Sequence, residues 1–185
     1  PTPTIGGVGL IKNLNNMMTK KFKEIDSIIL VIGKTTGHLF QSEFLREVVG
    51  IKEGPPPNIN LFNEKNNGLI VLKLINKKLV NSVHDISSGG LITALCEMSI
   101  EGKIGVKIKL PKNKINSHDY LFGEDQSRYL IEINKESKEE VIKILDENSI
   151  YYDVIGNTQK DIFDIDNELI LKLTELSEIN TVWFK

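Results

Sequence analysis

The sequence predicts an α+β fold in which a mixed β-sheet is layered with helices. Apolar runs bounded by glycine or polar residues recur along the 185 residues and indicate strands. Segments with apolar residues at helical spacing lie between them. Strands and helices interleave irregularly, and a short pair near the end of the chain looks antiparallel. This pattern favours a mixed sheet over a regular doubly wound fold, although α/β lies close to it.

The strands are expected where β-branched and aliphatic residues run together. The main runs cover residues 27–33, 79–85, 105–110, 128–133 and 152–156, and a further short pair is expected across 162–171. The longest apolar stretch, 28–32, is far shorter than the ~20 residues that span a bilayer. We therefore expect no membrane span.

Two helices follow from apolar spacing. Leu91, Leu95 and Met98 stand at i, i+4 and i+7. Val141 and Leu145 share one face of a segment that opens with 137–140 (SKEE), a capping-box pattern that predicts a helix start at Ser137.

A third helix is expected over 58–76, although Asn66-Asn67-Gly68 interrupts its pattern. A stiff loop at 54–57 (GPPP) separates it from a shorter helical segment at 44–49, because proline cannot continue a helix.

Composition excludes several classes of function. Lys and Arg number 23 against 25 Asp and Glu, without a basic run, which argues against a nucleic-acid surface. The single cysteine, Cys96, excludes an intramolecular disulfide and is better explained as a small core residue. We expect a cytoplasmic protein with a single domain over 1–185, whose residues 1–15 form a linker-like lead-in that starts PTPT without Met.

The most pointed local feature is the turn at 82–91 (SVHDISSGGL), where a strand ends and a helix begins. Backbone N–H groups at a helix start favour a phosphate or carboxylate, and Gly89 and Gly90 let an anion approach closely. Asp85 is then placed to hold a cation or hydroxyl. The alternative is that Asp85, Ser87 and Ser88 only cap the helix while the glycines permit tight packing.

A second cluster precedes the fourth strand, at 121–131 (LFGEDQSRYLI). Glu124, Gln126 and Arg128 share one side if the segment is extended, where they face a ligand's hydroxyls or amide. The alternative is an ordinary loop in which Arg128 pairs with Glu124 and Asp125 at the surface.

Two other patterns carry no site. Gly33 to Gly37 (GKTTG) is no P-loop, because Ile28 stands where that loop needs its first glycine. His38, His84 and His118 show no metal-ligand or catalytic-triad spacing, so neither a metal site nor a catalytic residue is predicted.

Four motifs in this order resemble the phosphoribosylformylglycinamidine synthase family, in its large synthetase chain. They are 1–11 (PTPTIGGVGLI), 37–45 (GHLFQSEFL), 84–91 (HDISSGGL) and 121–128 (LFGEDQSR). The resemblance covers nearly the whole chain. It is to the last of four domains, the second copy of a C-terminal module shared with aminoimidazole ribonucleotide synthetase, selenophosphate synthetase and thiamine-monophosphate kinase, and it implies the fold of that module.

The resemblance implies a part of a ligase that makes formylglycinamidine ribonucleotide in purine biosynthesis, using ATP, Mg²⁺ and ammonia derived from glutamine. It implies as partners the remaining modules of its own chain, a glutaminase subunit and a small accessory subunit. The catalytic groups of the family belong to other modules, so this piece is expected to be inactive alone. Its ligand-binding candidates are Asp85, Ser87, Ser88, Gly89, Gly90, Glu124, Gln126 and Arg128.

One departure bears on that site, because 39–44 reads LFQSEF where related second halves have LGGSEY. Two alternatives stay open. The chain is the C-terminal module of another superfamily member, of the thiamine-phosphate kinase or hydrogenase-maturation type, or it is a non-catalytic docking module.

Overall fold

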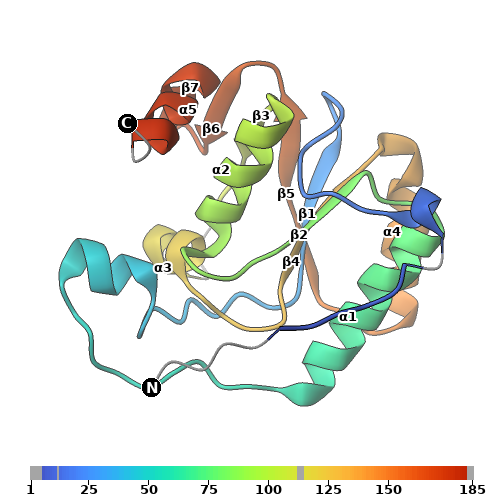
Figure 1. Cartoon of the computed structure of the whole chain (residues 1–185), viewed down its shortest axis with the longest axis horizontal. Helices are drawn as coiled ribbons and strands as arrows, with labels where there is room; N and C mark the ends of the chain where they lie inside the picture. The colour runs from blue at the N-terminus through green and yellow to red at the C-terminus, as the bar shows by residue number, and fades with distance from the viewer. Residues whose placement is uncertain (1–5, 12, 112–114, 183–185) are drawn as a thin grey trace.

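A seven-stranded mixed sheet forms the centre of the computed structural model, which describes residues 6–11, 13–111 and 115–182 (Figure 1). The strand order is β2-β4-β1-β5-β3-β6-β7. All neighbours pair antiparallel except β3 and β6, which are parallel. The strands are β1 (Ile28–Ile32), β2 (Ser82–Asp85), β3 (Gly105–Ile108), β4 (Tyr129–Ile133), β5 (Tyr152–Gln159), β6 (Ile162–Ile165) and β7 (Leu169–Lys172). The predicted α+β class is confirmed, with every expected strand present and β5 running past its expected end.

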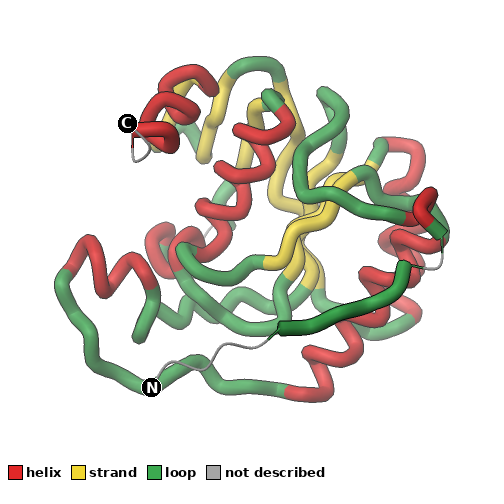
Figure 2. The backbone as a smooth tube through the Cα atoms, in the orientation of Figure 1, coloured by secondary structure: helices red, strands yellow, loops and turns green. Residues whose placement is uncertain are grey.

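Helices cover both faces of the sheet (Figure 2). On one face lie α1 (Leu61–Asn76) and α4 (Lys138–Glu147). On the other lie α2 (Gly90–Gly102), α3 (Ser117–Phe122) and α5 (Leu173–Thr181). Short 3₁₀ turns stand at Leu14–Asn16 and Lys135–Ser137, and the expected helical segment at Phe44–Val49 is a single wide turn of π-helix.

β1 is buried along its whole length because it serves two cores. Ile28, Leu30 and Ile32 face the core under α1 and α4, whereas Ile29 and Val31 face the core under α2. This alternation follows from the period of two along a strand. The described residues thus form one hydrophobic core on each face of the sheet.

α1 begins where its sequence allows an N-cap. The side chain of Asn60 accepts hydrogen bonds from the backbone N–H groups of Phe62 and Asn63, both at 3.1 Å. These bonds satisfy two of the free donors at a helix start. They fix the orientation of the first turn, which carries Asn63.

The expected capping box at Ser137 is wrong. Ser137 already has helical backbone angles, φ −80° and ψ −11°, and its side chain makes no capping bond. An N-cap needs an extended backbone, and here a 3₁₀ turn starts earlier, after Asn134. α3 and α5 were not expected from the sequence.

No helix in the described ranges is long and apolar enough to cross a membrane. In the expected lead-in, residues 1–5 and 12 lie outside those ranges. Residues 6–11 are exposed and without regular secondary structure.

Candidate functional site

The turn before α2 holds a carboxylate of the protein itself. Gly89 is the N-cap of α2, with φ +80°, and its backbone N–H donates to Oε1 of Glu124 at 2.8 Å. The same oxygen accepts from the backbone N–H of Glu43, also at 2.8 Å. The structure therefore brings Glu124 and Gly89 together. Glu124 accepts from the Gly89 N–H, which the sequence analysis had assigned to a bound anion.

Gly90 is required by packing. It has φ +72°, and a Cβ atom there would lie 2.7 Å from the carbonyl oxygen of Leu121. α2 and α3 thus approach closely at this corner. Ser87 and Ser88 are exposed, and the N-cap residue, Gly89, has no side chain to cap the helix.

Asp85 lies beside a polar network on the surface near α2. The ring of His84 contacts Asp85 at 3.3 Å and Glu97 at 2.7 Å. Lys20 reaches both Glu97 and Glu101 at 2.9 Å. Burial alone would raise the pKa of Glu97, but the hydrogen bonds from His84 and Lys20 outweigh it and hold the pKa below its usual value.

Asp125 binds the loop that follows β1. Its carboxylate accepts from the backbone N–H of Thr36 at 3.0 Å, of Gly37 at 2.9 Å and of His38 at 3.4 Å, and from the Thr36 hydroxyl. Burial by itself would raise the pKa of Asp125. The hydrogen bonds from these donors and the positive charge of the nearby Arg128 outweigh burial and lower the pKa of Asp125.

Arg128 is 2% exposed and lies beneath this loop. Its guanidinium donates to the carbonyl oxygens of Gly123 at 2.5 Å and Asp125 at 3.2 Å, and to the Thr35 hydroxyl at 3.2 Å. Burial lowers the pKa of Arg128, while the Asp125 charge opposes that shift. The surface ion pair considered for Arg128 is therefore not what the structure shows.

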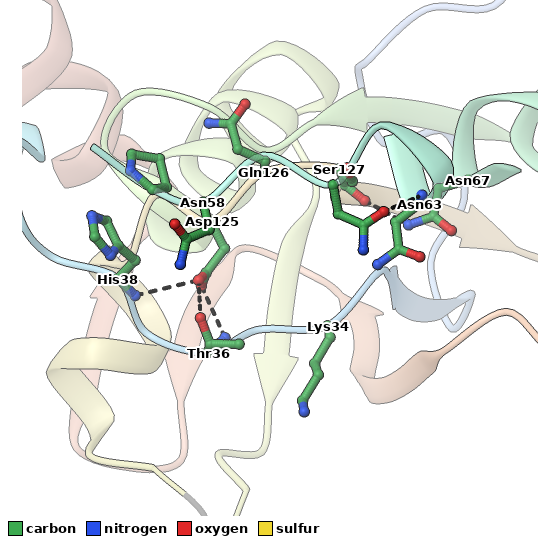
Figure 3. A pocket seen from close by; sticks show the side chains of 11 residues that line it. Lys34, Thr36, His38, Asn58, Asn63, Asn67, Asp125, Gln126 and Ser127 are labelled. Atoms are coloured by element: carbon green, nitrogen blue, oxygen red, sulfur yellow. Dashed lines mark hydrogen bonds between the residues drawn. The ribbon is translucent and has the colours of Figure 1, made fainter. Parts of the chain in front are cut away.

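A polar cavity of about 270 Å³ opens next to Asp125 (Figure 3). The loop after β1, the start of α1 and the turn after Asp125 line it. Its lining residues are Lys34, Thr36, His38, Pro57, Asn58, Asn60, Asn63, Asn67, Asp125, Gln126 and Ser127. Of the predicted site residues, this cavity contains Gln126 alone.

The asparagines of the cavity were missed from the sequence. Asn60, Asn63 and Asn67 stand at i, i+3 and i+7, which places them on one helix face. That spacing is a signal in the sequence that could have indicated a polar face on the helix expected over 58–76. Within the described ranges, no group of three or more His, Cys, Asp or Glu residues is arranged to hold a metal ion.

Residues 23–164 match the family model of the AIR synthase related protein, C-terminal domain. The chain is 54% identical over 183 residues to phosphoribosylformylglycinamidine synthase subunit PurL of Pelagibacter ubique, covering 99% of this chain and 25% of that relative. The corresponding subunit of Rhodopseudomonas palustris strain BisB5 is 38% identical over the same length. The chain thus spans about a quarter of the curated relatives it matches.

Solved structures show the same fold. T. maritima PurL complexed with FGAR superposes with a TM-score of 0.77 at 17% identity, over 89% of this chain and 30% of that one. That PurL has also been solved with ATP, with a TM-score of 0.68, and a structure of PurLQS from Thermotoga maritima matches at 0.67. Thiamine-monophosphate kinase from Stenotrophomonas maltophilia is more distant, at 0.55 over 82% of this chain and 53% of that one.

Proposed function

Because the chain belongs to the PurL family of phosphoribosylformylglycinamidine synthase subunits, we propose that it is a ligand-framing domain of the ligase that makes formylglycinamidine ribonucleotide. The observation that carries this role is the bond between Glu124 and Gly89. Because the Gly89 N–H already donates to Glu124, this turn is suited to a structural role at the edge of a binding site. It is poorly suited to binding the phosphoryl group during its transfer.

The whole enzyme, in this proposal, uses ATP with Mg²⁺ and ammonia from glutamine. The amide oxygen of the substrate is phosphorylated and ammonia then displaces it. This domain supplies no catalytic residue, so the 185-residue chain is inactive alone. It works in the cytoplasm against the other modules of its own chain, with a glutaminase subunit and a small accessory subunit as partners.

Five of the eight predicted site residues divide into two roles under this proposal. Asp85, Ser87 and Ser88 are exposed beside the glycines of the turn, where they face a phosphate-bearing nucleotide. Glu124 and Arg128 are positioning residues. Glu124 ties the backbone at Glu43 to the start of α2. Arg128 donates to the carbonyl oxygens of Gly123 and Asp125 and to the Thr35 hydroxyl.

A thermal-shift titration of the 185-residue chain tests this retained binding. Mg²⁺-ATP, Mg²⁺-ADP or the ribonucleotide substrate at several-fold over its dissociation constant should stabilise the fold by about 1 kcal/mol or more. Ser88→Asp puts a repelling charge on the turn and should remove the stabilisation. Thr174→Asp, at an exposed position in the first turn of α5, is the matched control and should leave it unchanged. If none of the three ligands stabilises the chain, the proposal that the turn before α2 binds a nucleotide is wrong.

One observation favours a second role, docking alone. On α1, the side chains of Leu61, Phe62, Leu69 and Leu72 are each more than half exposed. Such an apolar face suits contact with another part of the polypeptide. Docking without binding predicts no response to any nucleotide in the titration, together with a gain in solubility when Leu69 and Leu72 are changed to Gln.

A further inference from the structure

The cavity beside α1 has a composition that points to one class of ligand. We propose that it binds a small, neutral, polyhydroxylated molecule of about pentose size. Its volume of about 270 Å³ is near the lower limit for small-molecule sites. This proposal is independent of nucleotide binding at the turn before α2.

The frame of the cavity is fixed by contacts within the protein. Asn67, 7% exposed, donates through Nδ2 to the carbonyl oxygen of Ser127 at 2.8 Å. The Ser127 hydroxyl donates to Glu64, which also belongs to α1. These two contacts hold Ser127 in a left-handed conformation, φ +63°, that serine rarely adopts. On the far side, Asp125 holds the loop 36–38.

Three further carboxamides are left for a ligand. The side chains of Asn58, Asn63 and Gln126 are exposed and make no hydrogen bond within the described part of the chain. All three belong to the lining of the cavity. A carboxamide offers one acceptor oxygen and two N–H donors, and a hydroxyl group both donates and accepts. Neighbouring hydroxyls therefore match this lining.

The same lining disfavours charged ligands. Asp125 contributes a carboxylate to the lining, and Figure 3 shows the Lys34 side chain extending away from the carboxamides. At the start of α1, the N–H groups of Phe62 and Asn63 are already taken by Asn60. An anion would thus meet a negative charge with no cation directed at it.

An aromatic base is disfavoured as well. The lining contains no Phe, Tyr or Trp, and Pro57 is its one apolar residue. The His38 ring, which also belongs to the lining, is engaged through Nε2 with the carbonyl oxygen of Pro55 at 3.1 Å. Bases are commonly held by stacking on such rings, so the chemistry of the cavity selects hydroxyl groups.

The test is a ¹H–¹⁵N NMR titration of the 185-residue chain with D-ribose and, separately, ribose 5-phosphate. Ribose should shift the side-chain NH₂ signals of Asn58, Asn63 and Gln126 saturably, in the millimolar range. Asn63→Ala and Gln126→Ala should each weaken binding by about threefold to tenfold, as expected for one lost hydrogen bond. Asn66→Ala, on the same helix but outside the cavity, should leave the affinity unchanged.

Three outcomes would overturn the proposal. The first is the absence of saturable shifts in these NH₂ signals. The second is an affinity for ribose that Asn63→Ala and Gln126→Ala both leave intact. The third is binding of ribose 5-phosphate at least tenfold tighter than ribose, which would identify an anion site instead.

Discussion

The side-chain amide of Asn67 donates to the carbonyl oxygen of Ser127 at 2.8 Å, joining the middle of α1 to the turn before β4 across 60 residues of sequence. Asn67 lies on the buried side of a helix whose other buried residues are aliphatic. A buried carboxamide is stable there only because it has this partner.

Replacing Asn67 by Ala should therefore destabilise the protein by about 1–3 kcal/mol, because the Ser127 carbonyl loses a buried donor. Urea unfolding followed by circular dichroism measures the loss. Asn66→Ala, one position earlier on the less buried side, should change the free energy of unfolding by less than about 0.5 kcal/mol. Equal effects in the two variants would mean that the bond to Ser127 contributes nothing.

Asp125→Asn should destabilise the fold by about 1.5–3 kcal/mol at neutral pH, since several donors converge on this charge. The folded pKa of Asp125 is depressed, so its contribution is present above the unfolded pKa of about 3.9 and is lost as pH falls through the folded value. The difference between wild type and variant should shrink below about pH 4. A difference that stays constant across an acid titration of stability contradicts this account.

Glu124→Ala should release the tie between the loop at Glu43 and the start of α2. Both backbone N–H groups lose their acceptor, so hydrogen exchange at Gly89 and Glu43 should speed up relative to the core amides of β1. Glu124→Gln keeps an acceptor oxygen at the same position and should retain most of the protection. Identical exchange in the two variants would show that the contact does not hold the loop.

Comparing Gly90→Ala with Gly50→Ala distinguishes two causes of lost stability, a steric clash and a strained backbone. Both glycines have positive φ, +72° and +83°, but only at Gly90 would a Cβ atom meet other atoms, 2.7 Å from the carbonyl oxygen of Leu121. Gly50→Ala should cost about 1–2 kcal/mol, the strain of the left-handed region alone. Gly90→Ala should cost distinctly more, as measured by thermal unfolding. A smaller loss at Gly90 than at Gly50 would show that the α2–α3 corner can relax.

Much of the fold was predictable because local sequence agreed with tertiary environment. β1 was recognised by its unbroken run of aliphatic residues, as expected for a strand covered on both faces. The helix expected over 58–76 is present as α1, which starts three residues later, at Leu61, after the cap at Asn60. The capping box predicted at Ser137 was wrong because a serine side chain can cap a helix, but the backbone of Ser137 is already helical.

The cavity was not predictable in the same way. Its walls come from 34–38, 57–67 and 125–127, and only the folded sheet brings these segments together. α3 is too short, at six residues, for apolar periodicity to reveal it. The turn at 85–90 was located correctly, but its partner Glu124 comes from the loop after α3, which local sequence at the turn does not indicate.

The placement of β1 also governs how the chain reaches this state. The two strands that pair with β1 (Ile28–Ile32) are β4 and β5, which follow about a hundred residues later. During synthesis on the ribosome, the aliphatic β1 segment therefore stays unpaired until β4 and β5 have been made, and it can associate with other nascent chains. Pairing between strands so far apart in the sequence also slows folding. A polypeptide ending before β4 should consequently be insoluble and depend on chaperones, however well its first helices form.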